Sequence, residues 1–234
     1  LNYSSDVDVL YVCESHEGET KPAAPKGVKA KGSAQRGLSN EEYFEILARE
    51  LTKALTEQTH EGYLYRVDLR LRAEGSVGQL TRSLDEYDKY YRTRGQVWER
   101  LALLKSWPIA GSQEVGRSFV KLVRPFVLAS PSERSNVEQG LAIVEEVRSV
   151  KERIDAKMAE RGQEQRNVKL GGGGIREIEF FVQTIQVLAG RRLPRILDRG
   201  TIGSLTRLRN ADILSVKQQS GLTRAYQFLR DVEH

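Results

Sequence analysis

The apolar pattern of the chain changes near residue 84, and this change constrains the fold more than any other feature. Strand-like patterns occur only in the first 72 residues, whereas apolar residues from Leu84 onward recur at helical spacing. The helices predicted there are 84–93, 95–105, 112–128, 132–163, one from the Gly171–Gly174 run to about Leu188, 201–209 and 211–234. We therefore predict an α+β fold, with a small sheet-containing domain at 1–110 and an all-α helical bundle at 111–234.

Two segments of the first domain have the pattern of strands. Asp6–Val12 alternates and then becomes apolar, which is typical of a buried strand, and Tyr63–Leu71 places every second apolar residue on one face. Between them a helix is predicted to begin at Ser39, because Ser39 and Glu42 have the spacing of a capping box. Residues 14–38 are rich in Gly, Pro, Lys and Ala, so we predict a flexible surface insertion there.

The composition of the 234 residues argues against several classes of protein. No apolar run approaches the roughly 20 residues that cross a bilayer, so no membrane segment is expected. Lone Cys13 and three scattered histidines do not suit a disulfide scaffold or a Cys/His metal site, which leaves carboxylate-bound Mg²⁺ or Mn²⁺. The net charge of +5 comes from interspersed charges, without the dense basic block of a nucleic-acid arm. Neither a signal peptide nor a lipidation motif is present, and we expect a piece of a longer cytoplasmic protein.

Three carboxylates are the strongest candidates for chemistry. Asp6 and Asp8 are two residues apart on a predicted strand and therefore point to the same face, while Asp68 lies on the polar face of the second strand beside Arg70 and Arg72. If the strands are neighbours, the three acids could hold a pair of divalent cations, with the arginines next to phosphate oxygens. The alternative is an edge strand whose acids are solvated or paired with arginines, and the spacing alone favours that alternative.

Four segments in order resemble known signatures of the glutamine synthetase adenylyltransferase/adenylyl-removing family, which is built on the DNA polymerase beta-like nucleotidyltransferase core. The resemblance extends over the whole chain, except for the Gly/Pro-rich loop, and is most specific in these motifs. They are Leu1–Asp8 (LNYSSDVD), Arg66–Gly75 (RVDLRLRAEG), Gly95–Arg100 (GQVWER) with Leu103–Lys105, and Val168–Gln183 (VKLGGGGIREIEFFVQ).

The resemblance implies a fold and a reaction. It implies an N-terminally truncated nucleotidyltransferase core with a mixed sheet, followed by a helical bundle. In that family one half of the protein attaches AMP from ATP to a tyrosine of glutamine synthetase, and the other half removes it by phosphorolysis, which produces ADP. The wording of the motif at Ile175–Gln183 favours the adenylyl-removing half.

The family's residue roles can be carried over position by position. Its metal-binding carboxylates fall on Asp6, Asp8 and Asp68, and the resemblance implies that they hold Mg²⁺ or Mn²⁺ against the phosphates of ATP or ADP. Ser4, Ser5, Arg70 and Arg72 are then expected to contact phosphate oxygens. The implied partners are glutamine synthetase and a nitrogen-signalling regulatory protein, with no nucleic acid and no membrane.

Two other functions are weighed against this one. The family's Gly-Gly turn, which would precede Leu1 and cradle phosphates, is absent from these 234 residues. One alternative is therefore a catalytically silent regulatory module that binds a nitrogen-signalling protein, and an intact Gly-Gly-x-Glu immediately before Leu1 would favour the enzyme. An RNA-directed nucleotidyltransferase of the same superfamily would need a basic surface with stacking aromatic residues, for which the sequence gives little support.

Several features of the helical part have simpler interpretations. The amides of Gly171–Gly174 could bind an anion at the start of a helix, but a flexible connection is the more common role of such a run. Residues 167–170 are predicted to be extended. Trp98 is expected to lie in the core, and Gln183 and Gln186 are expected to face solvent.

Overall fold

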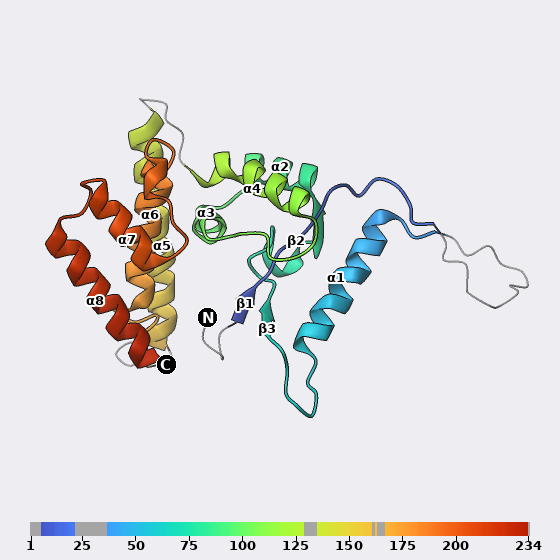
Figure 1. Cartoon of the computed structure of the whole chain (residues 1–234), viewed down its shortest axis with the longest axis horizontal. Coiled ribbons are helices and arrows are strands. Elements are labelled where there is room, and N and C mark those ends of the chain that lie inside the picture. Colours follow the sequence, from blue (N-terminus) through green and yellow to red (C-terminus); the bar gives the residue numbers. More distant parts are fainter. Residues whose placement is uncertain (1–5, 22–36, 129–134, 161, 163–166, 234) are drawn as a thin grey trace, which may run out of the picture. The chain divides into compact units, whose positions relative to one another are not determined.

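The computed structural model describes residues 6–21, 37–128, 135–160, 162 and 167–233 (Figure 1). The chain divides into two compact units, of which the first is Leu1–Thr93 with Pro108–Leu122 and the second is Arg94–Trp107 with Val123–His234. The boundary predicted at residue 110 is a different division, since residues 94–107 belong to the second unit and 111–122 to the first. The predicted domains therefore stay a prediction.

The fold is α+β, as predicted. The first unit contains β1 (Asp6–Asp8), β2 (Tyr11–Cys13), α1 (Asn40–Thr56), β3 (Arg66–Asp68), η1 (Gly75–Val77), β4 (Thr81–Ser83) and α2 (Leu84–Thr93). The remaining elements are α3 (Val97–Leu104), α4 (Gln113–Val127), α5 (Ser135–Glu160), α6 (Ile175–Ala189), η2 (Pro194–Ile196), α7 (Thr201–Asn210) and α8 (Val216–Glu233).

The strands form two separate parallel pairs. β1 pairs with β3, with Asp6 opposite Arg66 and Asp8 opposite Asp68. β2 pairs with β4, with Val12 opposite Arg82. The single strand predicted over 6–12 is thus divided, because its first part pairs with β3 and its second part with β4. We expected a mixed sheet, but the named strands in the described part of the chain pair only in parallel.

Other strand predictions also need correction. The strand predicted over 63–71 is limited to the three residues of β3, and β4 was not predicted at all. The sequence Thr81-Arg82-Ser83 has no apolar residue, yet all three side chains are buried. These side chains are buried because β4 packs against α1 and α2. A strand that is buried in this way has no apolar alternation, so its own sequence does not predict it.

α1 begins as its sequence predicts. Ser39 Oγ accepts a hydrogen bond from the Glu42 amide, and Glu42 Oε2 accepts one from the Ser39 amide, which completes the capping box. Just before the helix, Glu19 pairs with Ser39 in an isolated antiparallel bridge. Residues 14–18 form neither helix nor strand, in agreement with a loop, and residues 22–36 of the predicted insertion lie outside the described residues.

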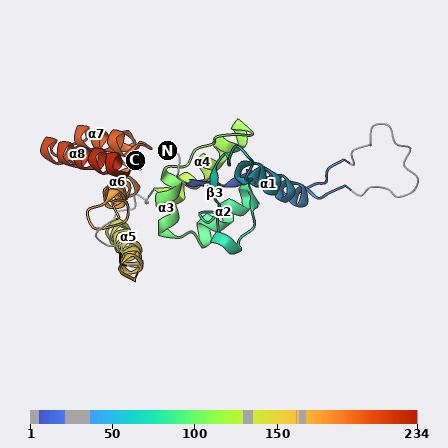
Figure 2. The same cartoon turned by 90° about the horizontal axis from the view of Figure 1, so that it is seen from below.

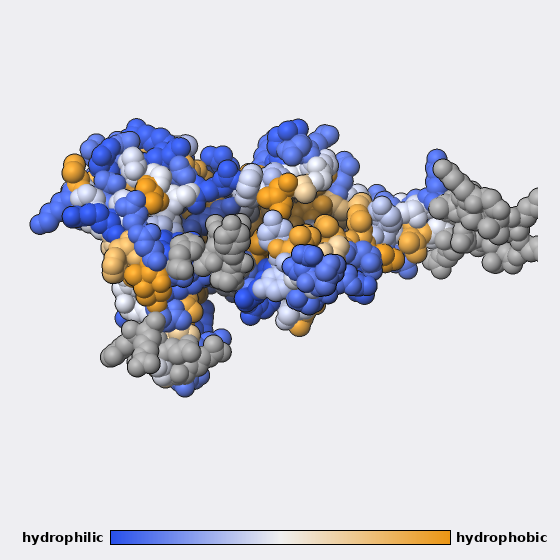
Figure 3. Space-filling model, turned by 60° about the horizontal axis from the view of Figure 1, so that its bottom comes forward, coloured by the Kyte–Doolittle hydropathy of each residue, from blue (hydrophilic) through white to orange (hydrophobic). Residues whose placement is uncertain are grey.

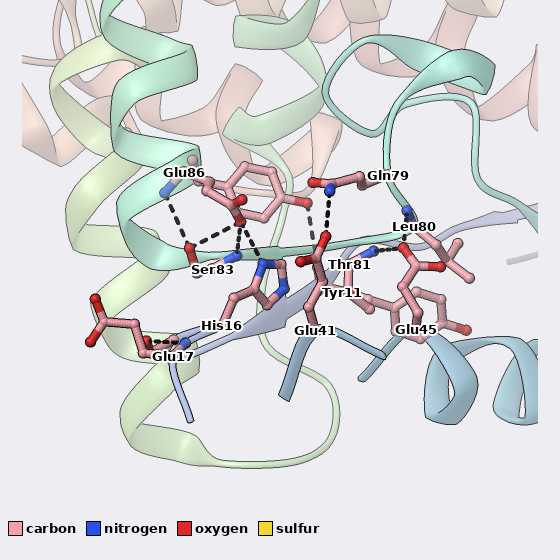
Figure 4. Close-up of polar contacts among 12 residues, drawn as sticks. Tyr11, His16, Glu17, Glu41, Glu45, Gln79, Leu80, Thr81, Ser83 and Glu86 are labelled. Atoms are coloured by element: carbon pink, nitrogen blue, oxygen red, sulfur yellow. Dashed lines mark hydrogen bonds and ion pairs between the residues drawn. The ribbon is translucent and has the colours of Figure 1, made fainter. Parts of the chain in front are cut away.

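α1 keeps much of its apolar face at the surface. Its only buried residue is Ala48, whereas four large apolar side chains are between 42% and 50% exposed: Tyr43, Ile46, Leu47 and Leu51. The helix is held by polar contacts instead (Figure 4): Glu45 accepts hydrogen bonds from the amides of Leu80 and Thr81, and Glu41 accepts one from Gln79. These carboxylates fix the chain immediately before β4.

The second unit is a helical bundle in which α6 is central. α6 packs against α5, α7 and α8 (Figures 1 and 2), and α3 packs against both α5 and α6. Val182 of α6 belongs to one core cluster with Ile196, Leu205, Leu208 and Leu214, and Val187 of α6 belongs to another with Leu101 and Ile143. α6 therefore contributes side chains to both core clusters of the bundle.

Most helices have the predicted extents, with local exceptions. The helix predicted over 211–234 begins at Val216, and residues 167–170 form a turn rather than an extended segment. The turn is closed by Asn167, whose Oδ1 accepts hydrogen bonds from the amides of Lys169 and Leu170. Trp98 is half-buried. Among the described residues, none of the helices combines the length and apolar character needed to cross a membrane.

The prediction that Gln183 and Gln186 face solvent is wrong. Both are buried, Gln186 almost completely. The Gln186 amide nitrogen lies 3.0 Å from three oxygens, namely the carbonyls of Ile196 and Asp198 and the Ser204 hydroxyl. A buried amide with such partners is stabilising rather than costly, since the chain supplies what water would have supplied.

Candidate active site on the β1–β3 pair

The three candidate carboxylates lie on one face of the β1–β3 pair. Asp6 and Asp8 are two residues apart on β1, and Asp8 is the register partner of Asp68 on β3. Residues opposite each other in a parallel pair point to the same side, as do residues two apart on one strand. Arg66, which is opposite Asp6, shares that face. Arg66 was not among the predicted site residues, although its position two residues before Asp68 on the same strand was a usable signal.

Arginines contact two of the acids directly. Arg66 Nε lies 2.8 Å from Asp6 Oδ1. Arg70 binds Asp68 through both its Nε, at 2.9 Å from Oδ2, and its Nη2, and the Arg70 amide donates to Asp68 Oδ1 at 2.8 Å. These hydrogen bonds from Arg70 lower the pKa of the Asp68 carboxyl, against a smaller opposing effect of burial.

The charge of Arg70 responds to all three acids. Its hydrogen bonds to Asp68 contribute most to raising its pKa, and the negative charges of Asp6 and Asp8 contribute further. The Arg70 side chain is nevertheless largely exposed. A solvent-accessible guanidinium next to carboxylates can exchange them for a phosphate that arrives with a stronger cation.

The donor chemistry of this face suits a hard divalent cation, but the side chains are not arranged around one. Carboxylate oxygens are the ligands that Mg²⁺ and Mn²⁺ prefer. Within the described residues, however, no group of three or more His, Cys, Asp or Glu side chains is placed so that it could hold a metal ion. The ion pairs of Asp6 with Arg66 and of Asp68 with Arg70 explain this arrangement, since each carboxylate is turned toward its arginine.

The other predicted site residues have different surroundings. Ser4 and Ser5 lie outside the described residues. The Arg72 guanidinium donates to three backbone carbonyls, those of Leu69, Ser76 and Gly78, at 2.7, 2.9 and 3.2 Å. Arg72 therefore closes the loop that follows β3, and a phosphate would have to compete with these three carbonyls. The roles of Ser4, Ser5, Arg70 and Arg72 remain predictions.

A second polar group lies beside the β2–β4 pair (Figure 4). Glu86 of α2 accepts hydrogen bonds from the Ser83 amide and hydroxyl and lies 3.1 Å from His16 Nδ1. Burial is the largest single effect on the Glu86 pKa and raises it, but the hydrogen bonds from Ser83 and the charges of His16 and Arg82 together lower the pKa below its usual value. Nearby Cys13 is buried, and burial raises the pKa of its thiol from 9.0 to about 11. The thiol is therefore protonated at neutral pH and unsuited to nucleophilic chemistry.

The Gly171–Gly174 run offers little to an anion. The amides of Ile175 and Arg176, at the start of α6, donate to the carbonyls of Val168 and Lys169, and the Gly173 amide donates to the Glu177 carboxylate. Gly174 is required for this approach, because a Cβ there would lie 2.7 Å from the Val168 oxygen. The glycine run therefore lets the backbone carbonyls of the preceding turn accept hydrogen bonds from the first amides of α6.

Comparisons with known proteins cover the whole chain. The family model described as glutamate-ammonia ligase adenylyltransferase matches residues 1–122, and the model described as GlnD PII-uridylyltransferase matches residues 148–234. Three relatives carry the name bifunctional glutamine synthetase adenylyltransferase/adenylyl-removing enzyme. They are from Nitrosococcus oceani (39% identical), Hahella chejuensis (35%) and Xanthomonas oryzae (36%). Each alignment includes 100% of this chain and 22–23% of the relative, so the chain spans just over a fifth of their length.

Proposed function

The chain belongs to the glutamate-ammonia ligase adenylyltransferase family, and from this membership we propose that it is part of a nucleotidyltransferase that changes the AMP state of a tyrosine on glutamine synthetase. We further propose that these residues belong to the half that removes AMP by phosphorolysis, with phosphate and a nucleotidylated tyrosine as substrates and ADP as product. The proposed core is that of the DNA polymerase beta-like nucleotidyltransferases.

One observation carries the proposal. The family match over residues 1–122 includes both strands of the β1–β3 pair, and the register places Asp6, Asp8 and Asp68 on one face with Arg66. Three acids on adjacent parallel strands form the donor set that a two-cation phosphoryl-transfer site needs. The match to a second nucleotidyltransferase-related model over 148–234 supports the same class of chemistry.

The residues of this face would act by position and charge. Asp6, Asp8 and Asp68 would hold Mg²⁺ or Mn²⁺, which when bound would neutralise the charge of the nucleotide phosphates. Arg70 and Arg66 would leave their present carboxylate partners and offer their guanidinium groups to phosphate oxygens, in the geometry that suits a fork of two N–H donors. No covalent bond to the protein is needed, because orientation and charge neutralisation provide most of the rate in this class of transfer.

The experiment uses the full-length protein that contains these residues, with AMP-modified glutamine synthetase, phosphate and Mg²⁺. We expect ADP to form, and Asp8→Asn to reduce turnover by at least about a hundredfold, since the substitution removes a metal-binding charge while keeping the shape. Asp85→Asn is the matched control, because Asp85 is an exposed acid in the first turn of α2, away from β1 and β3. It should keep normal turnover.

The outcomes separate the parts of the proposal. Loss of AMP addition rather than of AMP removal in Asp8→Asn would reverse the proposed direction and leave the site intact. Normal turnover of Asp8→Asn in both directions, in a protein that folds as the wild type does, would show that this face is not the site.

A second candidate is a catalytically silent module that binds a nitrogen-signalling protein. It is favoured by the absence, among the described residues, of a three-carboxylate group arranged for a metal, and by the engagement of Arg72 with its own loop. Calorimetric titration of Mn²⁺ distinguishes the two candidates. Weaker Mn²⁺ binding by full-length Asp8→Asn than by the wild type supports the enzyme, and unchanged Mn²⁺ binding supports the silent module.

A further inference from the structure

The positive charge of the chain is concentrated in one segment of the second unit. Residues 190–210 contain six arginines and a single acid, Asp198, which gives this segment a net charge of +5. The whole chain has the same net charge of +5, so the other residues balance one another. The charges of the chain are therefore not interspersed everywhere, as was expected from the sequence, because this segment is an exception.

Five of the arginines are exposed and come from a chain that folds back on itself. They are Arg191, Arg192, Arg195, Arg199 and Arg207, which we call the arginine patch. Gly190 lies against Leu197, since a Cβ at position 190 would be 2.5 Å from Leu197 Cδ2, and Arg207 donates to the carbonyl of Arg195. The turn after α6, η2 and α7 therefore contribute to one surface. In the view of Figure 3, hydrophilic residues cover most of the part of the second unit formed by α7 and α8.

The backbone that carries the arginine patch is rigid. Ile196, which directly follows Arg195, is fully buried in the core cluster with Leu205 and Leu208. The buried Gln186 amide holds the carbonyls of Ile196 and Asp198, and Asp198 in turn accepts from the Gly200 amide and pairs with Arg207 at 2.9 Å. A surface that is already ordered loses little conformational entropy on binding.

Two of the five charges in the arginine patch, those of Arg191 and Arg195, are left for a partner. Asp198 pairs with Arg207, but within the described part of the chain Arg191 and Arg195 form no ion pair. Positive charges concentrated in one segment repel one another, and an anionic partner relieves that repulsion. We propose that the arginine patch binds an acidic surface of a protein partner, in which Asp and Glu carboxylates accept bidentate hydrogen bonds from the arginines.

The observations favour a protein over RNA. Binding of single-stranded RNA relies on aromatic faces on which bases stack. The exposed aromatic side chain next to the patch is Trp107, and Arg199 already covers its ring, with the guanidinium carbon 4.3 Å from the ring centre. Arginine and tryptophan together are typical of the energetically dominant part of protein–protein interfaces.

The test measures binding of two labelled probes to the 234-residue chain by fluorescence anisotropy at low salt. The probes are an oligo-glutamate peptide and an oligouridylate of equal net charge. We expect the peptide to bind more tightly than the RNA, and the triple substitution Arg191→Gln, Arg195→Gln and Arg199→Gln to weaken peptide binding by about tenfold. Replacing the same three arginines by lysine should recover only part of the affinity, because lysine keeps the charge but lacks the planar fork.

The matched control removes three charges elsewhere. Arg117, Lys121 and Arg124 are exposed cations on one face of α4, and changing all three to Gln should alter peptide affinity by less than about twofold. Circular dichroism with thermal unfolding confirms that both triple variants fold. An equal loss of peptide affinity in the two triple variants would show that the peptide responds only to the net charge of the chain, and it would overturn the proposal. Tighter binding of oligouridylate, lost on substitution of the patch, would assign the surface to RNA instead.

Discussion

The two strand pairs of the first unit have the same parallel pairing and the same length, but opposite environments. In β1–β3 the acidic and basic side chains are exposed or half-buried, and they pair across the strands as Asp6 with Arg66. In β2–β4 the residues of β4 are all buried, and the neighbouring polar groups are hydrogen-bonded within the protein, as Ser83 is with Glu86. One pair thus presents its charges to solvent, while the other holds the unit together.

Under the proposed function, this difference separates function from stability within one small unit. Charged groups that bind a ligand need access to solvent, which the Arg70 side chain has. Polar groups that are buried need permanent partners, because an unsatisfied one costs about 1–3 kcal/mol. Substitutions in β1–β3 are therefore expected to affect activity, and substitutions around β2–β4 are expected to affect unfolding.

The largest expected effect on stability comes from Tyr87. This residue is 1% exposed, contacts Tyr91 and Phe119 through its ring and lies next to β2, where its hydroxyl donates to the Tyr11 carbonyl. Tyr87→Ala should lower the free energy of unfolding by about 3–5 kcal/mol, because it leaves a large cavity. Tyr65→Ala, which removes a half-exposed ring immediately before β3, should cost less than about 1 kcal/mol. Urea unfolding measures both, and equal costs would contradict the contrast between the pairs.

A pH-dependent effect is expected at Cys13, at the end of β2. Burial raises its pKa from 9.0 to about 11, so the folded protein keeps its proton in a pH range where the unfolded chain loses it. Stability should therefore be complete below pH 9 and decline as the pH rises from 9 toward 11. Iodoacetamide at pH 8 should alkylate Cys13 much more slowly in the native than in the urea-unfolded chain. The variant Gln227→Cys supplies an exposed thiol in the same molecule, and mass spectrometry of its peptides would show equal labelling if Cys13 were accessible.

The smallest effect is expected at Thr81 of β4. Its hydroxyl is buried and has no hydrogen-bond partner among the described residues. Thr81→Val keeps the shape and removes the unsatisfied group, so stability should stay the same or increase by up to about 1 kcal/mol. Thr52→Val is the control, since the Thr52 hydroxyl bonds with Tyr11 and the Ala48 carbonyl and its loss should cost about 1 kcal/mol. A clear loss at Thr81 would mean that an ordered water satisfies it.

The helices could be predicted because their signals are local. The capping box at Ser39 and the apolar spacing after Leu84 are properties of a few consecutive residues, and the helices at those positions are confirmed. β4 could not be predicted, because its burial depends on α1 and α2 rather than on its own three residues. The burial of Gln186 likewise depends on carbonyls 10 and 12 residues further along the chain.

The candidate site could be predicted less completely than the helices but better than β4. The strand period predicted that Asp6 and Asp8 share a face, and the register of β1 with β3 adds Asp68 to it. Pairing of the acids with arginines was the stated alternative and is observed. The particular pair of Arg66 with Asp6 was not predicted, because it depends on which residues of two distant strands stand opposite each other. The metal ligands themselves stay a prediction.

Arg72 has a consequence for how an alanine scan of this family should be interpreted. Its guanidinium joins three carbonyls of the loop after β3, and the same loop contains Glu74 with a positive φ of 64°, a backbone conformation that few residues other than glycine adopt readily. Removing Arg72 would release this loop and disturb β3, which carries Asp68. An inactive Arg72→Ala protein would thus have the phenotype of a lost phosphate ligand while the actual defect is in the shape of the loop.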